Sequence, residues 1–551
     1  MSDYVIGVDV GTGSARAGLF DLRGKLLAMA VEPIQIWRPH PHHVEQSSED
    51  IWRAVSTVVR ACCQRAECRP EAVRGISFDA TCSLVVLGDQ DQPLPVNFEG
   101  DANRNIIVWM DHRALAEAEE INAGHYEVLR YVGWKISPEM ETPKLLWLKR
   151  NLPETWQKAR RFFDLADYLT YRATGNDTRS FCTVVCKWTY LGHVGENGTW
   201  DHNYFKAIGL EDVLERGLAG HIVRPMGSPL GKLSPQAATD LGLTTECSVG
   251  VGIIDAHAGG IGLLGAVWDE DEPLNPARLD TALAYIGGTS GCHMAVSQEP
   301  RFLQGVWGPY YSAMIPGMWL IEAGQSSAGS AIDQAVLDHA NAPSLQAEAT
   351  ERSCTPHEIL NSYLEHQATQ SQESHWALLT RDIHVLPFYL GNRSPYADPH
   401  ARAVLDGLTL DNSINSQALR YLATIQGVCS VDYLVIQALN NAGFNIQTLF
   451  VTGGITKNPL WLQTLADATG LPCVLPAEEE AVLLGTAILA AVGSQAYPDV
   501  LTAMRAMCHR GRVVQPNLSL KPYYEARHRI IENLYQQQLA HRNMMKPFET
   551  R

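Results

Sequence analysis

Apolar residues at the start of the chain alternate with turn residues in the manner of a β-meander. Tyr4 to Val10 is a short apolar run, Gly11-Thr12-Gly13-Ser14 has the composition of a turn, and Ala15 to Asp21 and Lys25 to Val31 continue the pattern. Glycine and hydroxyl residues between such runs mark turns between strands. We therefore expect three strands, followed by a helix that starts near Ser47, where apolar residues take up helical spacing.

The same pattern returns halfway along the chain. Leu283 to Gly287 runs into Gly288-Thr289-Ser290, and another apolar segment follows from Cys292 to Val296. A third apolar run ends at Gly453-Gly454 and leads into a helical pattern from Leu460 to Thr469. Two strand–glycine–strand patterns a domain apart predict a duplicated architecture whose halves face each other across a cleft.

Length, charge and hydropathy narrow the class of protein. A chain of 551 residues exceeds what one hydrophobic core supports, so two large domains are expected. The net charge of −17 disfavours a binder of nucleic acid or of anionic membranes, because such a surface repels phosphates. Val249 to Trp268 is apolar, but Asp255, His257 and several glycines suit a strand–turn–helix better than a membrane span. No secretory leader is visible, so a cytoplasmic location is expected.

The cysteines give little sign of a metal or disulfide framework. Twelve are present, with Cys62 next to Cys63 and Cys182 four residues before Cys186, but without paired C-x-x-C units. We expect reduced, mostly buried thiols in preference to a zinc site or disulfides.

Asp9 is the first candidate for chemistry. It ends the first predicted strand, immediately before the Gly11-Thr12-Gly13-Ser14 turn. Such a hairpin offers several donors to a phosphate tail, and a carboxylate beside it can hold Mg²⁺ directly or through water. The same pattern also fits an ordinary hairpin with an incidental acid.

Asp255 is the second candidate. It lies in a glycine-rich apolar segment, where a desolvated carboxylate has a raised pKa and is useful as a base. The alternative is a cap of the helix that follows. Neither a Walker A motif nor a dinucleotide fingerprint is present: the glycines from Gly7 to Gly13 have the wrong spacing and lead into a hairpin.

Five segments, taken in order, resemble the FGGY carbohydrate kinases of the actin-like, ribonuclease-H-like ATPase superfamily over essentially the whole chain. They are Asp9-Val10-Gly11-Thr12, Pro143-Lys144-Leu145-Leu146-Trp147-Leu148, the Asp255 segment, Gly287-Gly288-Thr289-Ser290, and Gly453-Gly454 with Lys457-Asn458-Pro459. The resemblance implies an α/β fold of two actin-like (ribonuclease H-like) ATPase domains that face each other across a cleft. We expect an N-terminal, sugar-binding domain at 1–267, a nucleotide-binding domain at 279–510 and a helical tail at 511–551, with the acidic segment from Trp268 to Arg278 as the connection.

The resemblance also implies roles for individual residues, with ATP and Mg²⁺ as cofactors. Asp255 would be the catalytic base, which accepts the proton of the sugar hydroxyl, and Asp9 would position Mg²⁺. The remaining nucleotide-binding candidates are Gly11, Thr12, Gly13 and Ser14 in the first hairpin, Gly288, Thr289 and Ser290 in the second, and Gly453, Gly454, Lys457 and Asn458 at the adenosine.

Within the family the chain resembles the ribulokinases. The string Thr81-Cys82-Ser83-Leu84-Val85 is similar to the D-ribulokinase branch, whereas the Gln-Met-His segment of xylulokinases and the Arg-Glu segment of glycerol kinases are missing. The implied sugar-binding candidates are Ala80, Thr81, Cys82, Asp111, Lys187, Asp255 and Glu322. Taken singly, Lys187 also fits a surface lysine, Cys82 a core filler and Glu322 a helix start.

The expected reaction is phosphorylation of D-ribulose on its 5-hydroxyl. L-Ribulose, xylulose and ribitol are alternative substrates, and a non-catalytic actin-like ATPase or sensor is a distant alternative that the retained Asp255 disfavours. The basic, tyrosine-containing tail reads as a helix that docks on the body or serves as a homodimer contact.

Overall fold

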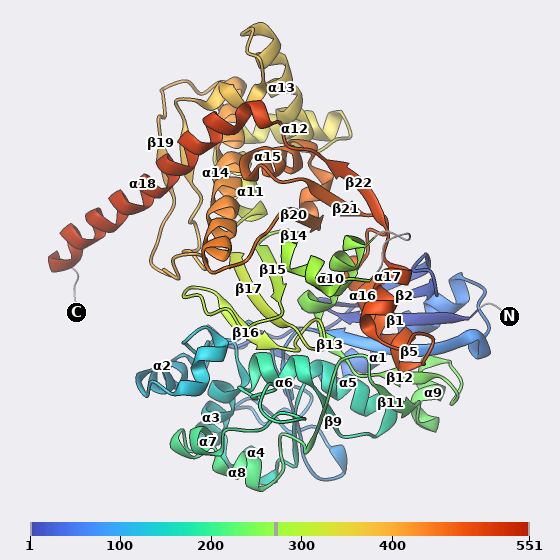
Figure 1. Cartoon of the computed structure of the whole chain (residues 1–551). Helices are drawn as coiled ribbons and strands as arrows, with labels where there is room; N and C mark the ends of the chain where they lie inside the picture. Colours follow the sequence, from blue (N-terminus) through green and yellow to red (C-terminus); the bar gives the residue numbers. More distant parts are fainter. Residues whose placement is uncertain (1–2, 269–273, 549–551) are drawn as a thin grey trace.

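The N-terminal half is built on one mixed sheet. In the computed structural model, which describes residues 3–268 and 274–548, its order is β11 (Pro229–Lys232), β12 (Ser248–Gly250), β5 (Val73–Ala80), β1 (Tyr4–Val10), β2 (Ser14–Asp21) and β3 (Leu26–Pro33), and β13 (Ile253–Ile254) pairs with β5 (Figure 1). Strands β1, β2 and β3 form an antiparallel meander, and β5 runs parallel to β1. The three predicted strands are confirmed.

The C-terminal half repeats this arrangement. Its sheet has the order β16 (Trp307–Tyr311), β17 (Trp319–Gln325), β15 (Gly291–Ser297), β14 (Ala282–Gly287), β20 (Thr448–Thr452), β21 (Cys473–Pro476) and β22 (Arg510–Val514). Strands β14, β15 and β17 form an antiparallel meander, and β20 and β21 lie parallel on the far side of β14. If the principal strands of each half are numbered in chain order, both sheets have the order third, second, first, fourth, fifth. This shared order confirms the predicted duplication.

Smaller sheets and helices surround the first sheet. The short strands are β4 (Glu45–Gln46), β7 (Ile106–Ile107), β6 (Leu84–Leu87), β8 (Arg161–Asp164), β9 (Thr178–Ser180) and β10 (Ile222–Arg224). The helices of this half are α1 (Ser48–Arg65), α2 (Leu115–Ala123), α3 (Glu141–Asn151), α4 (Pro153–Lys158), α5 (Leu165–Thr174), α6 (Phe181–Lys187), α7 (His202–Ala207), α8 (Glu211–Glu215), α9 (Pro235–Leu241) and α10 (Asp255–Leu264). Helix α1 begins after Ser47, whose hydroxyl accepts a hydrogen bond from the backbone N–H of Asp50 as a helix cap.

The C-terminal half of the chain provides a further set of helices. They are α11 (Gly329–Leu337), α12 (Ala342–Glu351), α13 (Pro356–Gln370), α14 (Ile414–Asn441), α15 (Pro459–Thr469), α16 (Ala481–Gly493), α17 (Val500–Met507) and α18 (Lys521–Met545), with a short sheet of β18 (His384–Leu386) and β19 (Val404–Asp406). Helix α14 is long and apolar enough to cross a membrane, but 83% of its most apolar window is buried inside the molecule. This is the environment of a core helix.

Two small-residue helices join the halves. Helix α16 comes from the C-terminal half, but it packs against strands β1 and β5 of the N-terminal sheet and against α10. A Cβ at Gly485 would lie 1.9 Å from the carbonyl oxygen of Ala258, and one at Gly7 would lie 2.3 Å from that of Leu483. Backbones can approach this closely only because glycine has no side chain.

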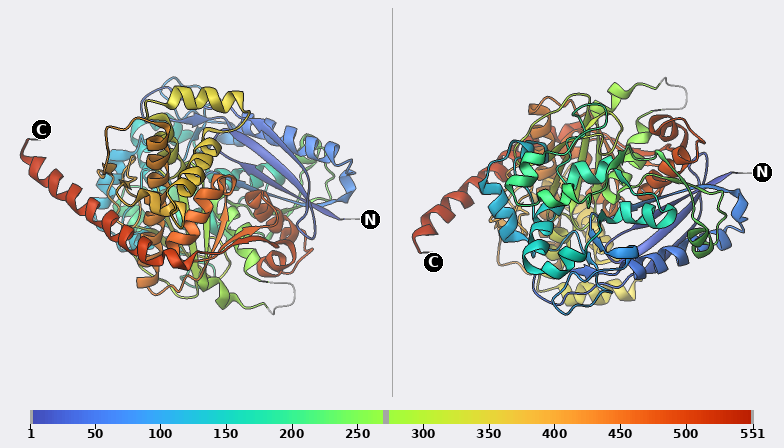
Figure 2. Two further views of the ribbon diagram at one scale, coloured as in Figure 1. Left: turned by 90° about the horizontal axis from the view of Figure 1, so that it is seen from above. Right: turned by 90° about the horizontal axis from the view of Figure 1, so that it is seen from below.

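The tail ends in a projecting helix. Strand β22 still belongs to the second sheet, so the helical part of the tail begins only at Lys521. The first turns of α18 pack on α14, and its last turns extend away from the body in all three views (Figures 1 and 2). The expected domain limits at 267, 279 and 510 stay predictions, and residues 269–273 of the expected connection lie outside the described residues.

Candidate active site

Three aspartates meet at the ends of parallel strands in the N-terminal sheet. Asp9 on β1 is the direct partner of Asp79 on β5, and Asp79 is in turn paired with Ile253 on β13. Strand β13 ends at Ile254, so Asp255 opens α10 at the same edge of the sheet. Asp9 and Asp79 are buried. The structure thus brings the two acids singled out in the sequence together with a third, Asp79.

Each of the three carboxylates has a different electrostatic environment. Arg16 lies opposite Asp9 on β2, and its Nε donates a 2.8 Å hydrogen bond to Oδ2 of Asp9. Burial, with the charge of Asp9, raises the pKa of Asp255 to about 6. Burial and the charges of Asp9 and Asp255 raise the pKa of Asp79 well above its usual range, although Thr486 of α16 donates a hydrogen bond to it. At neutral pH Asp255 is therefore ionised and able to accept a proton.

The first glycine turn lies beside these acids. The N–H of Gly11 donates to the carbonyl of Ser14 over 3.0 Å and closes the turn between β1 and β2. The hydroxyl of Thr12 accepts a 3.0 Å hydrogen bond from Nε1 of Trp109, and a Cβ added at Gly13 would meet no atom within 4 Å. Trp109 thus holds the turn at Thr12, while the space at Gly13 is open to a ligand, as a phosphate-binding hairpin requires.

The second and third glycine turns meet each other. The N–H of Gly288 donates to the carbonyl of Ser290 over 2.9 Å, and the intervening Thr289 is exposed. Gly453 has a φ of +93°, and a Cβ there would lie 2.6 Å from the carbonyl oxygen of Gly287. Glycine is thus required at 453 both by the left-handed conformation and by the close approach of the β14 turn.

The residues expected at the adenosine separate into two groups. Gly454 and Lys457 are exposed after β20. Asn458 instead caps α15: its Oδ1 accepts from the N–H of Trp461 at 3.3 Å, and its Nδ2 donates to the hydroxyl of Tyr421 at 2.7 Å. The Asn458 side chain therefore already has a structural role, whatever it contributes to the nucleotide.

The expected sugar residues come from both halves. Ala80 ends β5, and Thr81 and Cys82 follow it within the buried interior next to Asp79. Lys187 ends α6 and Glu322 lies on β17. Burial acts to lower the pKa of Lys187, but nearby groups that include Cys82 and Glu322 raise it well above its usual range. Lys187, which belongs to the first half, therefore remains a cation, and it lies near Glu322 of the second half.

Asp111 is an exception, because the structure gives it a structural role. It is fully buried, and its carboxylate accepts hydrogen bonds from the N–H of Val44 at 2.6 Å and from Nη2 of Arg113 at 2.8 Å. Arg113 is also fully buried and bridges to Glu45. The Asp111 side chain is thus enclosed by structural partners, and its place in the sugar site stays a prediction.

His257 links the acid cluster to Glu322. It lies in the first turn of α10, with Nδ1 3.1 Å from Sγ of Cys182 and Nε2 3.4 Å from Oε2 of Glu322. Burial acts to lower the pKa of His257, but Cys182 and Glu322 raise it to about 10. Burial acts to raise the pKa of Glu322, but His257, Lys187 and Arg393 lower it to about 2. Glu322 is therefore held as an anion.

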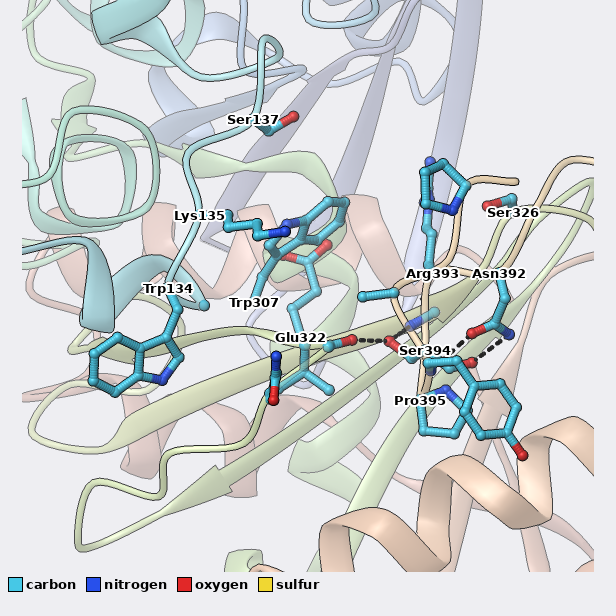
Figure 3. A pocket seen from close by; sticks show the side chains of 18 of the residues that line it. Trp134, Lys135, Ser137, Trp307, Glu322, Ser326, Asn392, Arg393, Ser394 and Pro395 are labelled. Atoms are coloured by element: carbon cyan, nitrogen blue, oxygen red, sulfur yellow. Dashed lines mark hydrogen bonds between the residues drawn. The ribbon is translucent and has the colours of Figure 1, made fainter. Parts of the chain in front are cut away.

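A cavity of about 740 Å³ opens beside Glu322. Its wall includes Trp307, Glu322 and Arg393 from the second half and Lys135 and Ser137 from the first (Figure 3). The guanidinium of Arg393 lies 5.5 Å from the ring centre of Trp307, and Nζ of Lys187 lies 6.0 Å from the same ring centre. A volume of this size suits a small polar ligand, and charged groups of both signs suit a polyhydroxylated one.

Several of these residues were not found by sequence reasoning. Arg16, Asp79, His257 and Arg393 belong to the site, but only strand pairing and long-range packing bring them there. For Arg16 a signal was available: on a hairpin closed at Gly11 to Ser14, it falls opposite Asp9. For Arg393, about seventy residues beyond Glu322, the sequence contains no comparable signal.

The donor set beside the first hairpin fits a hard divalent cation. Asp9, Asp79 and Asp255 provide carboxylate oxygens, the ligand type that Mg²⁺ prefers. Oδ1 of Asp79 is buried without a hydrogen-bond partner among the described residues, and burial, together with the repulsion between the acids, raises the pKa values of Asp79 and Asp255. A cation among them would relieve both features.

Two facing domains of the same strand order, with glycine turns, carboxylates and a polar cavity between them, define a two-domain sugar kinase. Comparison with protein families agrees: the N-terminal domain of the FGGY carbohydrate kinases matches residues 4–262, and the C-terminal domain matches residues 283–494. The chain belongs to the FGGY family of carbohydrate kinases, and it is an enzyme of the sugar kinase type.

Similar proteins span nearly the whole chain. A human FGGY carbohydrate kinase domain-containing protein is 46% identical over 545 residues, 97% of this chain and 96% of its own. A D-ribulokinase of Saccharomyces cerevisiae is 38% identical over 525 residues, 90% of this chain and 72% of its own. Among solved structures, a gluconate kinase of Lactobacillus acidophilus is similar in fold, with a TM-score of 0.78 at 20% identity, covering 99% of this chain and 98% of its own.

Proposed function

We propose that this enzyme transfers the γ-phosphoryl group of Mg·ATP to the 5-hydroxyl of D-ribulose. The observation that carries the proposal is the position of Asp255, an ionised base at the same edge of the sheet as Asp9 and near enough to Lys187 for the two charges to interact. The choice of sugar rests on the 38% identity to the yeast D-ribulokinase and on the Thr81-Cys82-Ser83 string that the chain shares in pattern with that branch.

Asp255 acts as the general base in this proposal. Its carboxylate accepts the proton of the sugar hydroxyl as the oxygen attacks the γ-phosphorus, and the bond from that phosphorus to the ADP oxygen breaks. The glycine turns at Gly11 to Ser14 and at Gly288 to Ser290 hold the phosphates through backbone N–H groups and hydroxyls. Mg²⁺, which Asp9 and its neighbours would hold, would neutralise phosphate charge. Positioning and charge neutralisation supply most of the rate.

Lys187 and Glu322 orient the sugar. Lys187, close to Trp307 of the cavity wall, can donate hydrogen bonds to a sugar hydroxyl, and Glu322, in that wall, can accept one from an adjacent hydroxyl. A substrate that lacks one of these hydroxyls, or carries it with the opposite configuration, leaves a buried charge unpaired and is rejected. This is the basis on which D-ribulose would be separated from L-ribulose, xylulose and ribitol. A cytoplasmic location and a homodimer contact through the tail stay predictions.

The test is an ADP-release assay with Mg·ATP against D-ribulose, L-ribulose, D-xylulose, L-xylulose, ribitol and glycerol. We expect the highest kcat/KM with D-ribulose, and a fall of about 10²-fold or more in Asp255→Asn. The matched control is Asp382→Asn, an exposed aspartate of the second half, which should retain wild-type rates. A preference for another sugar that still depends on Asp255 would keep the kinase and reject D-ribulose. Wild-type turnover in Asp255→Asn would reject the mechanism.

A further inference from the structure

A buried cluster of two thiols and an imidazole lies behind the sugar site. Cys182 and Cys186 are one turn apart on α6, and His257 comes from α10. All three side chains are buried, and their ligand atoms lie within 4.8 Å of one another. The sequence alone favoured plain buried thiols, because the spacing of the two cysteines matches no zinc motif. The fold changes this interpretation by adding His257, seventy-five residues away from Cys182.

We propose that Cys182, Cys186 and His257 bind one soft divalent metal ion of the zinc type, distinct from the magnesium of the phosphoryl transfer. Two thiolates and an imidazole are the ligands that zinc prefers, whereas Mg²⁺ prefers oxygen. Zinc lies about 2.3 Å from sulfur and about 2.0 Å from nitrogen, which separates its tetrahedral ligand atoms by roughly 3.5–3.8 Å. Nδ1 of His257 and Sγ of Cys182 are 3.1 Å apart, so a shift of a few tenths of an ångström admits the ion.

The second nitrogen of His257 supports this assignment. A metal-bound histidine ordinarily donates its other N–H to a carboxylate, which fixes the ring and its tautomer. Here Nε2 of His257 lies 3.4 Å from Oε2 of Glu322, while Nδ1 faces the thiols. The carboxylate of Glu322 and the thiols therefore face opposite nitrogens of the His257 ring, as the carboxylate and the metal do where a histidine binds zinc. Glu322 also lines the cavity, so one carboxylate connects His257 with the cavity wall.

The position of the cluster predicts what the ion does. Cys186 directly precedes Lys187 at the end of α6, and His257 follows Asp255 by two residues at the start of α10. An ion held by both helices would brace the sugar-binding lysine against the catalytic base. Because the ligands converge only in the folded chain, binding would also stabilise the folded state and release the thiol protons.

The test uses the full chain, freed of metal by a chelator and titrated with Co²⁺ as a spectroscopic probe. We expect a thiolate-to-cobalt charge-transfer band that saturates at one equivalent, a higher Tm, and loss of the band when Zn²⁺ displaces Co²⁺. Cys186→Ser should weaken Co²⁺ binding more than about tenfold, since losing a ligand costs more than losing an outer-shell partner. Cys247→Ser, a buried thiol elsewhere in the same half, should bind like the wild type.

Glu322→Gln provides a second variant that keeps all three ligands, should Cys186→Ser fail to fold. It should weaken binding by about 10–100-fold while the charge-transfer band remains attainable at higher Co²⁺. The proposal would be overturned if the wild type showed no band. It would also be overturned if both Cys186→Ser and Glu322→Gln kept the band at wild-type affinity, or if Cys247→Ser lost it.

Discussion

Asp9 and Asp79 occupy directly paired positions on the parallel strands β1 and β5, yet their partners differ. Arg16, on β2 at the other side of β1, donates a hydrogen bond to Asp9, whereas Thr486 of α16 donates one to Asp79. A carboxylate beside a guanidinium is stabilised as an anion, while a buried one near two other acids is stabilised in its protonated form. The pKa of Asp79 is raised accordingly, by burial and by Asp9.

Asparagine should therefore replace Asp79 with little loss of stability. In the absence of Mg²⁺, Asp79→Asn keeps the shape of a protonated acid and still accepts the hydrogen bond of Thr486. We expect its free energy of unfolding to stay within about 1 kcal/mol of wild type, whereas Asp79→Ala, which removes one of the two acceptors of the Thr486 hydroxyl and leaves a cavity, loses about 1–3 kcal/mol. Urea unfolding measures both. Equal losses in the two variants would show that Asp79 is charged in the fold.

Glu322→Gln should act mainly on sugar binding. The substitution removes the charge that faces the cavity but keeps the shape, so hydrogen bonds from sugar hydroxyls lose their charged acceptor. Such bonds contribute about 1.5–3 kcal/mol, which corresponds to a rise of roughly 10–100-fold in the KM for the sugar. Steady-state kinetics with the preferred sugar is the measurement, and Glu351→Gln, at an exposed position of α12, is the control. A fall in kcat at constant KM would place Glu322 in the chemical step instead.

The elements that the sequence predicted well are those coded locally. The three strands from Tyr4, the hairpin at Gly288 and the cap of α1 at Ser47 depend on neighbouring residues, and the structure has them as expected. The repeated strand–glycine–strand pattern predicted the two facing halves, and the family resemblance, confirmed by the domain matches, supported this prediction.

The site was predicted less completely, because its remaining members depend on contacts distant in sequence. Asp79 becomes part of the acid cluster only through the register between β1 and β5, and His257 only through the packing of α10 on α6. Asp111, which is expected in the sugar pocket, also forms an ion pair with Arg113, two residues away, inside the core. The pattern of polar residues does not distinguish these cases, since each looks like an isolated acid or base in an apolar segment.

The crossing of α10 and α16 should be intolerant of a single methyl group. At an ordinary interior helix position, replacing glycine by alanine gains up to about 1 kcal/mol. At Gly485, however, the new Cβ would lie 1.9 Å from the backbone oxygen of Ala258, and overpacking costs about 1–3 kcal/mol. The clash should win, so Gly485→Ala should lower Tm. Gly13→Ala, whose methyl meets no atom within 4 Å, is the stability control. An unchanged or higher Tm for Gly485→Ala would show that the two helices can separate without loss.

His528 should make the stability of the C-terminal half depend on pH. It stacks on Tyr433 of α14 with ring centres 3.8 Å apart, and its Nε2 donates a 2.9 Å hydrogen bond to the carbonyl of Ala468. Burial lowers its pKa to about 4, and Arg527 of the same helix acts in the same direction. Tyr524, also on α18, is the other titratable side chain against the ring. The fold therefore favours the neutral imidazole.

Since the folded pKa lies below the unfolded value of about 6.5, the stability contributed by His528 is complete above pH 6.5 and is lost as the pH falls towards 4. Linkage gives a loss of roughly 2 kcal/mol at pH 5. Urea unfolding at pH 7.5 and pH 5 should show a smaller difference, by about that amount, in His528→Phe than in the wild type. His541→Phe, an exposed histidine on the same helix, should keep the wild-type difference. If His528→Phe and the wild type lose stability equally on acidification, the imidazole titrates normally in the fold and other groups account for the acid sensitivity.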